Sequence, residues 1–418
     1  MGFLARLAFK NLFRHKLRTF VSIIAIAFSV MVVVFARGYV VGLIDNLTLE
    51  HIQYDSGHIK LITHEYRDEQ RLLPLNYPVD GLGGGGLDEM ITALENVEGV
   101  AMVVPRLKFG AMVSTEDELV TMGGWGVDPE LETAFTGIED YLVEGRMPQP
   151  GRLEVLMGTA LLEKINRRVG EKVTIVFNTA FNSLRGVTFK IVGRTKSGIK
   201  LLDEVVFYLP LDQAQRLLEM DGQVTELLLV TPDKKLVLQV LPRVQALLAE
   251  YGEDGRYLAL SYKETSDLIF FMDIAKLIYN QIYIFLVLLA CIVVVNTMLM
   301  IVKERTREIG MMSALGLESK DIMRLFLTEG AIMGVTGSLI GAVCGSLING
   351  YFAKNGIDFS AATSGFSSEV IFNSIVYPLS SPGNTIFAFF LGVVIVTIAC
   401  VIPARRAARL EPTEAMRV

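Results

Sequence analysis

The segment that decides the fold is Lys303-Glu-Arg-Thr-Arg-Glu-Ile-Gly-Met-Met-Ser-Ala-Leu-Gly316, a charged stretch enclosed by long apolar sequence. Ile278–Val302 before it carries no charge, and Leu325–Phe352 after it carries one acid, Glu329. About 20 helical residues cross a hydrocarbon core roughly 30 Å thick. The pattern therefore predicts two membrane-spanning helices joined by a short, structured loop.

Two further apolar stretches lie near the ends of this 418-residue chain, of which 51% is hydrophobic. Thr19–Ile44 is interrupted only by Arg37, and Thr385–Ile402 is uncharged. The first stretch is too long for a signal-peptide core and lacks a small-x-small cleavage site, so we interpret it as a retained anchor. The sequence thus predicts four transmembrane helices, at residues 19–44, 277–302, 325–352 and 385–402.

Lysine and arginine flank these spans unevenly. Fourteen lie before the first span, between the second and third, or after the fourth, against Lys354 alone between the third and fourth. Because positive flanks remain in the cytoplasm, we expect both termini, the coupling loop 303–324 and the tail 403–418 there. Residues 45–276 and the short loop 353–384 are then extracytoplasmic. This topology indicates a multi-pass protein of a bacterial inner membrane.

Residues 1–18 place Phe3, Leu4 and Leu7 on one helical face and Arg6 and Lys10 on another. This pattern predicts a short amphipathic helix lying in the cytoplasmic membrane interface.

The large segment 45–276 has mixed helical and strand periodicity and a net charge of −13, from 23 Lys/Arg and 36 Asp/Glu. Such an acidic domain disfavours a nucleic-acid partner. We expect an α/β subdomain from residues 45–104 with 222–275, and a more β-rich one from 105–221. A helical stalk over Tyr262–Lys276 is expected to continue into the second span.

No catalytic constellation or metal site is indicated. The three cysteines, Cys291, Cys344 and Cys400, all fall within predicted spans and suit apolar packing. Three histidines lie near acids in the large segment, but their spacing fits no standard zinc pattern; they are His51, His58 and His64, with Asp55 and Glu65. We therefore expect no cofactor bound by this chain and no enzymatic activity of its own.

Small residues recur every four positions in the third span, at Gly337, Gly341 and Gly345. This ridge allows close helix packing, either within the subunit or between subunits. Glu329 lies about one turn inside the same span, where we expect it to cap the coupling element or to pair with Arg324.

The coupling loop, with its continuation to Thr328-Glu-Gly330, closely resembles the signature of the FtsX/MacB-type permease family. The ending Ile402-Pro-Ala-Arg-Arg-Ala-Ala-Arg-Leu-Glu-Pro-Thr-Glu-Ala-Met-Arg417 and the start Ala8–Thr19 are similar to the same family. The resemblance implies an ABC transporter permease that pairs with a second permease, identical or paralogous, and docks on a separate cytoplasmic ATPase dimer that binds ATP and Mg. It also implies that the coupling contacts are Glu304, Arg305, Arg307, Glu308, Ile309, Met312, Leu315 and Gly316.

Within that family, Asp55-Ser-Gly-His-Ile-Lys60 and the length of the outer segment look like the lipoprotein-releasing permeases. This resemblance implies lipoprotein cargo and a periplasmic carrier. Phe181 and Leu184, in the turn 178–186, are candidates for a carrier contact, and a plain hairpin turn is the other interpretation. Two alternative functions remain: a MacB-like mechanotransmission permease for efflux or stress response, and an FtsX-like regulator of a periplasmic partner.

Overall fold

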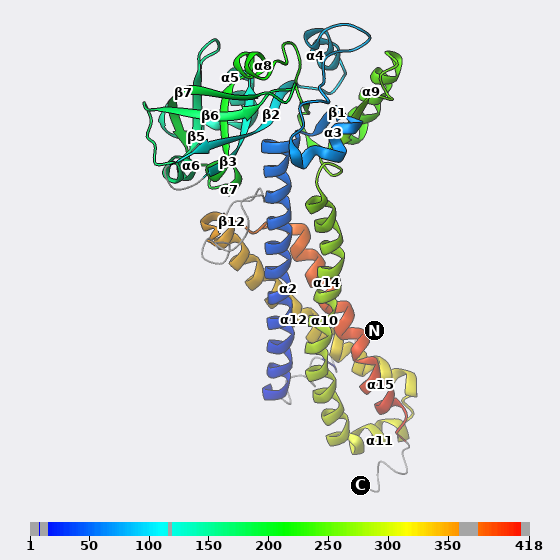
Figure 1. Ribbon diagram of the computed structural model, residues 1–418. Helices are drawn as coiled ribbons and strands as arrows, with labels where there is room; N and C mark the ends of the chain where they lie inside the picture. The colour runs from blue at the N-terminus through cyan, green and yellow to red at the C-terminus, as the bar shows by residue number, and fades with distance from the viewer. Residues whose placement is uncertain (1–7, 9–15, 116–118, 359–374, 411–418) are drawn as a thin grey trace. The chain divides into compact units, whose positions relative to one another are not determined.

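The computed structural model describes residues 8, 16–115, 119–358 and 375–410 (Figure 1). The described chain divides into a helical unit, built from residues up to Asp45, Met272–Asp358 and from Ile375 onward, and an α/β unit that begins at Asn46 and ends at Phe271. Residues 1–7 and 9–15, which make up most of the predicted amphipathic helix 1–18, lie outside the described residues.

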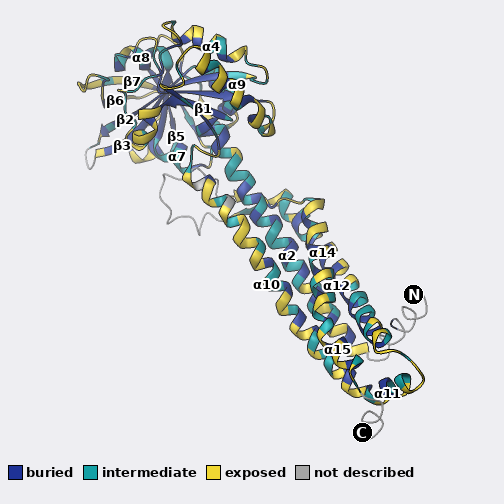
Figure 2. Cartoon of the chain, turned by 90° about the vertical axis from the view of Figure 1, so that its right-hand side faces the viewer, coloured by how far each residue is buried: buried dark blue, intermediate teal, exposed yellow. Residues whose placement is uncertain are grey.

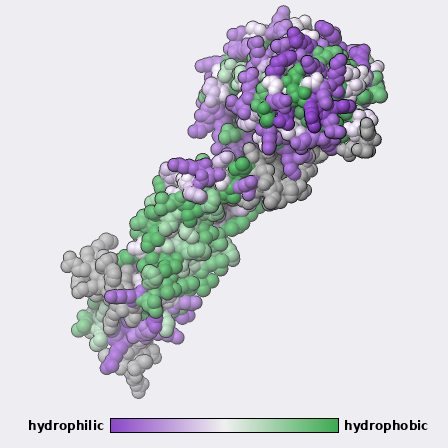
Figure 3. All heavy atoms as spheres, turned by 90° about the vertical axis from the view of Figure 1, so that its left-hand side faces the viewer, coloured by the Kyte–Doolittle hydropathy of each residue, from purple (hydrophilic) through white to green (hydrophobic). Residues whose placement is uncertain are grey.

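Four long helices form the helical unit. They are α2 (Lys16–His51), α10 (Asp267–Glu304), α12 (Ser319–Asn355) and α14 (Pro382–Ala399). Each is long and apolar enough to cross a membrane. Figure 3 shows a predominantly hydrophobic surface along these helices, whereas the surface of the α/β unit is mostly hydrophilic. The predicted fold class, four membrane helices with a mixed α/β domain inserted between the first two, is confirmed.

Shorter elements complete the helical unit. α11 (Thr306–Ala314) separates α10 from α12, and α15 (Val401–Ala408) follows α14. α14 and α15 meet at Cys400, shortly before Pro403, which lacks a backbone N–H, and together they contain the expected fourth span, 385–402. β11 (Ile357–Asp358) pairs antiparallel with β12 (Ile375–Val376).

The helices pack around a core drawn from all four spans. Val30, Val294, Met333 and Val396 are each fully buried in it. Figure 2 shows exposed residues along the outer sides of the same helices. An interior packed with apolar side chains and an equally apolar exterior are what a bilayer-embedded bundle requires.

One sheet of ten strands runs through the α/β unit in the order β10-β1-β9-β2-β3-β8-β5-β7-β4, with β6 paired to β2 and β7. The strands are β1 (Ile59–Thr63), β2 (Met102–Ser114), β3 (Leu119–Val127), β4 (Leu142–Gly145), β5 (Glu154–Gly158), β6 (Lys172–Asn178), β7 (Leu184–Thr195), β8 (Val206–Pro210), β9 (Glu226–Val230) and β10 (Tyr257–Ser261). Most pairs are antiparallel, but β3 with β8 and β5 with β7 are parallel.

Helices of the α/β unit are short. They are η1, a π-helical turn (Ile52–Ser56), α3 (His64–Glu69), α4 (Leu87–Glu95), α5 (Pro129–Thr136), α6 (Thr159–Lys164), α7 (Lys200–Glu204), α8 (Leu211–Leu218) and α9 (Val237–Glu250), with 3-10 turns η2 (Gln70–Leu72), η3 (Ile138–Tyr141) and η4 (Lys234–Leu236). Asp128 caps α5 by accepting from two backbone amides, and Gly137 ends it in the left-handed conformation.

Two large apolar cores lie along this sheet, beside two smaller clusters. One gathers residues of 105–221, including Phe109, Phe177 and Phe207, whose rings meet edge to face. The other joins α4 and α9 to β1, β9 and β10. Because β2 is 13 residues long and pairs with β9, β3 and β6, it carries the sheet continuously from one core to the other.

The expected helical stalk over Tyr262–Lys276 begins later than predicted. α10 starts at Asp267, because Tyr262–Thr265 forms a turn in which Glu264 accepts from the amide of Ser261 and Thr265 donates to the carbonyl of Tyr262. The turn satisfies its own polar groups and so does not join the helix.

Candidate functional site

The coupling segment folds as a corner between two spans. Arg305 leaves the helical conformation between α10 and α11, and Gly316, with φ of +99°, ends the second helix in a region that favours glycine. Glu318 then stands before α12 in an extended conformation. We name residues 303–316 the coupling corner.

The expected contact residues of the coupling corner divide into two groups. Ile309 is fully buried and Met312 packs against the same core, so these side chains hold α11 on its own bundle. Leu315 is 85% exposed, and Glu304, Arg307 and Gly316 are exposed as well. The second group is accessible to another subunit, and Glu308 is partly exposed.

Arg305 joins the coupling corner to the third span. It is 6% exposed, its Nε lies 2.9 Å from Glu308 Oε2, and its Nη1 lies 3.4 Å from Glu329 Oε1. The expected pair between Glu329 and Arg324 is wrong, because Arg324 contacts Asp321 one turn before it at 3.3 Å. Arg305 therefore connects α11 to α12 within this subunit through buried ion pairs, and it is not accessible to a partner subunit.

The glycine ridge of α12 packs against α2 in the same subunit. A Cβ at Gly337 would lie 2.8 Å from Ile26 Cβ, and one at Gly345 would lie 2.7 Å from Val34 Cβ. A Cβ at Gly341 would collide with the carbonyl oxygen of Ala27. Of the two interpretations left by the sequence, packing within the subunit is the one that the structure contains.

Arg37 of α2 is half-buried among protein groups. Its Nε donates to Asn384 Oδ1 at 3.0 Å and its Nη1 donates to Asn280 Oδ1 at 2.8 Å. Its guanidinium carbon stands 3.9 Å from the centre of the Phe387 ring. Three spans therefore contribute to the position of this cation.

A buried ion-pair network, which sequence reasoning missed, lies inside the α/β unit. Lys60 Nζ is 3.1 Å from Glu226 Oε2, and Lys108 Nζ is 2.8 Å from Glu226 Oε1 and 2.7 Å from Asp55 Oδ1. Lys60 and Glu226 are fully buried. We name Asp55, Lys60, Lys108 and Glu226 the clamp network. Because Asp55 belongs to η1, directly after α2, the network attaches this turn to three strands, β1, β2 and β9.

The electrostatics of the clamp network stabilise its charged forms. Burial alone would raise the pKa of Glu226, but attraction to Lys108 and Lys60 outweighs burial and holds that pKa below its usual value. Beside the network, Arg106 forms a two-point pair with Glu132 at 2.6 and 3.0 Å and donates to the carbonyl of Tyr54 at 2.6 Å. The only visible signal in the sequence was lysine within apolar strand runs, as in His58-Ile-Lys-Leu-Ile62.

The three histidines do not converge. His51 is buried and lies 2.8 Å from Thr265 Oγ1, His58 accepts from the amide of Thr231, and His64 is exposed at the start of α3. In the part of the chain that the structure describes, no group of three His, Cys, Asp or Glu side chains is arranged to hold a metal ion.

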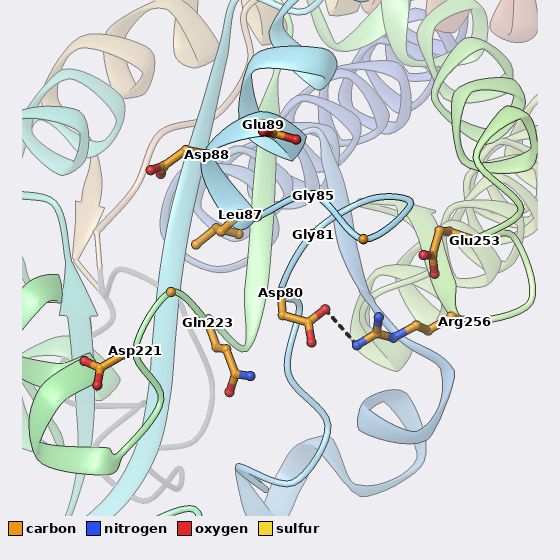
Figure 4. Close-up of a pocket in the computed structure, with 13 residues that line it drawn as sticks. Asp80, Gly81, Gly85, Leu87, Asp88, Glu89, Asp221, Gln223, Glu253 and Arg256 are labelled. Atoms are coloured by element: carbon orange, nitrogen blue, oxygen red, sulfur yellow. Dashed lines mark ion pairs between the residues drawn. The ribbon is translucent and has the colours of Figure 1, made fainter.

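An acidic hollow of about 660 Å³ opens beside the glycine loop 81–86 (Figure 4). Asp88 and Glu89 reach it from α4, and Asp221 and Glu253 from separate loops. Arg256 pairs with Asp80 at 2.7 Å and neutralises part of this charge. The glycines form a loop in which Gly83 has a positive φ, a conformation that favours glycine.

The predicted carrier contact lies in a short hairpin turn between β6 and β7. Phe181 is 75% exposed and Leu184 is 70% exposed. Arg185, next to Leu184, pairs with Glu219 at 2.8 Å and anchors the hairpin to the end of α8. The turn thus presents two apolar side chains from an anchored base.

Comparison with known proteins places this architecture among membrane permeases. Residues 19–247 match the family described as MacB-like periplasmic core domain, and residues 280–412 match the FtsX-like permease C-terminal family. The lipoprotein-releasing system transmembrane protein LolC of Neisseria meningitidis is 25% identical over 337 residues, covering 77% of this chain and 79% of that protein. The macrolide export ATP-binding/permease protein MacB of Nitrobacter winogradskyi is 27% identical over 311 residues, covering 73% of this chain and 43% of that protein.

Among solved structures, the chain is similar to the periplasmic region of MacB from Actinobacillus actinomycetemcomitans. That alignment has a TM-score of 0.36 and 12% identity and covers 52% of this chain and 94% of the other. The extracellular domain of the transporter YknZ aligns with a TM-score of 0.35 and 13% identity, over 49% of this chain and 99% of that one.

Proposed function

This chain is an ABC transporter permease of the FtsX/MacB family, and from that premise we propose that it releases lipoproteins from the bacterial inner membrane towards a periplasmic carrier. The observation that carries the proposal is the alignment with LolC, which extends over 77% of this chain and 79% of that relative. The alignment with MacB leaves more than half of that protein unmatched.

Energy comes from a separate cytoplasmic ATPase dimer, which holds ATP and Mg, so this chain is a transport subunit. A second permease, identical or paralogous, completes the assembly. Both termini and the coupling corner face the cytoplasm, because that side collects the positive flanks. The accessible residues of the corner, Glu304, Arg307, Leu315 and Gly316, dock on the ATPase.

Force from the ATPase reaches the helical bundle through the ion pairs that Arg305 makes with Glu308 and Glu329. Because Arg305 touches Glu308 in α11 and Glu329 in α12, a displacement of α11 moves both spans that it separates. α10 is one continuous helix from Asp267 to Glu304, and it transmits the displacement along its own axis. A packed helix moves as a rigid element, which suits this role.

The clamp network holds η1, the turn that follows α2, on the sheet of the α/β unit. Asp55 follows α2 within one π-helical turn and is held by Lys108, and the chain enters β1 four residues later. Movement of α2 is therefore transferred to the sheet. The exposed pair Phe181 and Leu184 receives the carrier.

A second candidate is mechanotransmission for efflux or stress response, favoured by the match of residues 19–247 to the MacB-like periplasmic core. In that case the α/β unit moves a bound periplasmic adaptor protein and carries no acylated cargo. The third alternative, an FtsX-like regulator of a periplasmic partner, shares the same coupling corner.

Reconstitution separates these functions. The full-length chain with its co-purifying ATPase is placed in proteoliposomes containing an acylated lipoprotein, and ATP-dependent transfer to a soluble carrier is measured. Lipoprotein in the soluble fraction supports the proposal, and the hydrolysis-deficient ATPase is the control. Coupled ATP hydrolysis without any transfer, together with capture of an adaptor, would overturn lipoprotein release and favour mechanotransmission.

A further inference from the structure

One cation of the helical unit has no countercharge among the residues that the structure describes. Arg37 of α2 is half-buried, and its partners, Asn280 of α10 and Asn384 of α14, are neutral. No carboxylate among the described residues lies within ion-pair distance of it. A charge among apolar helices is costly unless it is paired, so an unpaired arginine in a span points to a function.

The contacts of Arg37 fix the direction of its remaining donors. Its Nε and Nη1 are each bound to an amide oxygen, and the guanidinium is stacked on Phe387 at 3.9 Å. Its Nη2 donates to none of the described groups. A guanidinium held at two nitrogens is a preorganised receptor for an oxyanion, because its planar fork matches two oxygens.

Two further donors belong to the same cluster. Asn384 Nδ2 and the hydroxyl of Tyr283 are buried and have no hydrogen-bond partner among the described residues; the two residues are 8% and 2% exposed. Tyr283 lies one helical turn from Asn280 on α10. An unsatisfied buried polar group costs about 1–3 kcal/mol, so a ligand or ordered water that satisfies both groups is favoured.

The depth of the cluster matches a headgroup. Arg37 lies 21 residues beyond Lys16 on α2, which corresponds to about 32 Å at 1.5 Å per residue. Asn384 lies in the first turn of α14. These positions are one hydrocarbon thickness, roughly 30 Å, from the coupling corner side of the bundle.

We propose that Arg37, Asn280, Tyr283 and Asn384 form a binding site for a phosphate group, supplied by an anionic phospholipid of the outer leaflet. The phosphate oxygens accept from Arg37 Nη2 and from the free donors of the cluster. The site pins α2, α10 and α14 together at the end opposite to the coupling corner. It rests on the membrane orientation proposed above and is independent of the cargo.

The test uses the full-length protein purified in mild detergent. Thermal unfolding is followed while phosphatidylglycerol, phosphatidylcholine or inorganic phosphate is added, and bound phospholipid is counted by native mass spectrometry. The expected result is retention of phosphatidylglycerol and a rise in Tm of several degrees with it, absent with phosphatidylcholine. Arg37→Gln should weaken this effect at least tenfold, whereas Lys354→Gln, an exposed cation on α12, should keep it.

A second variant keeps the test decisive if Arg37→Gln does not fold. Asn384→Asp retains the acceptor for Arg37 and supplies an internal countercharge, so it should fold and lose its dependence on phosphatidylglycerol. Protection by inorganic phosphate that Arg37→Gln abolishes would support the phosphate site with a soluble source. Protection that is equal in wild type and Arg37→Gln, or no response to either anion, would overturn the site and leave water as the occupant.

Discussion

Arg305 Nη1 and Glu329 Oε1 lie 3.4 Å apart, and both side chains are buried, at 6% and 2% exposure. The pair connects the first residue after α10 to the third turn of α12, across 24 positions of sequence. The coupling corner is thereby attached to the bundle by charge as well as by the buried side chain of Ile309. A signal arriving at α11 cannot move that helix alone.

Removal of either charge should uncouple the subunit. Arg305→Ala removes the guanidinium that pairs with the buried Glu329 carboxylate, which costs roughly 3–5 kcal/mol. Glu329→Ala and Glu308→Ala should also lower substrate-stimulated ATP hydrolysis while membrane insertion persists. The measurements are ATPase activity of the assembled complex and Tm of the permease.

Asp321→Ala is the matched control for these variants. It breaks the exposed pair with Arg324, which is worth at most about 1 kcal/mol. If the Arg305→Ala and Glu329→Ala variants keep normal substrate-stimulated ATP hydrolysis, the proposed role of the Arg305–Glu329 pair in coupling is refuted.

The glycine ridge offers a test of packing between α2 and α12. Gly341→Val should separate the two helices, because even a Cβ at this position meets the backbone of Ala27. We expect destabilisation of about 1–3 kcal/mol, seen as a lower Tm in detergent. Gly350→Ala in the same helix is the control, since nothing lies within 4 Å of its Cβ position. Equal Tm values for the two variants would contradict the assignment.

The clamp network predicts a pH dependence that Trp125, the single tryptophan of the chain, can report. Its ring centre lies 4.6 Å from Lys108 Nζ. Because the pKa of Glu226 is held below its usual 4.5 in the folded state, its contribution to stability is present above that pH and is lost as the pH falls through the lowered value. The free energy of unfolding, followed by Trp125 fluorescence, should therefore be constant between pH 7 and 5 and should decrease below about pH 4.5.

Glu226→Gln removes this titration. The variant should be less stable at pH 7, by roughly 3 kcal/mol, because two lysines lose a buried partner. The difference in the free energy of unfolding between this variant and the wild type should become smaller as the pH falls below 4.5. A constant difference across the whole range would mean that Glu226 does not carry the charge assigned to it.

The hairpin turn should matter for transfer and not for folding. The double variant Phe181→Ser with Leu184→Ser changes two exposed side chains, so the Tm should stay within the range of ordinary surface substitutions. Carrier binding and lipoprotein transfer should fall at least tenfold. Leu238→Ser, at a residue 85% exposed on α9, is the control. Transfer that survives the double variant identifies the segment as a plain turn.

Much of the architecture was predictable because the membrane restricts it. An uncharged run of 20 residues in a bilayer has only the helix available, so Ile278–Val302 could be assigned from composition alone. The resemblance of the coupling corner and the C-terminal segment to the FtsX/MacB-type family is confirmed by the matches over residues 19–247 and 280–412. The start of α10 was predicted too early because the turn Tyr262–Thr265, which satisfies its own polar groups, shows no hydrophobic periodicity that would distinguish it from the helix.

By itself, the sequence determined the number of spans, the insertion of the α/β domain and the family, because hydropathy and local motifs are properties of adjacent residues. Only the tertiary structure decided the partners of charged side chains. Arg305 with Glu329, Lys108 with Asp55, and Arg37 with Asn384 are separated by 24, 53 and 347 positions. Such pairs depend on which helices and strands become neighbours, and the local hydrophobic periodicity of a sequence does not specify these neighbours.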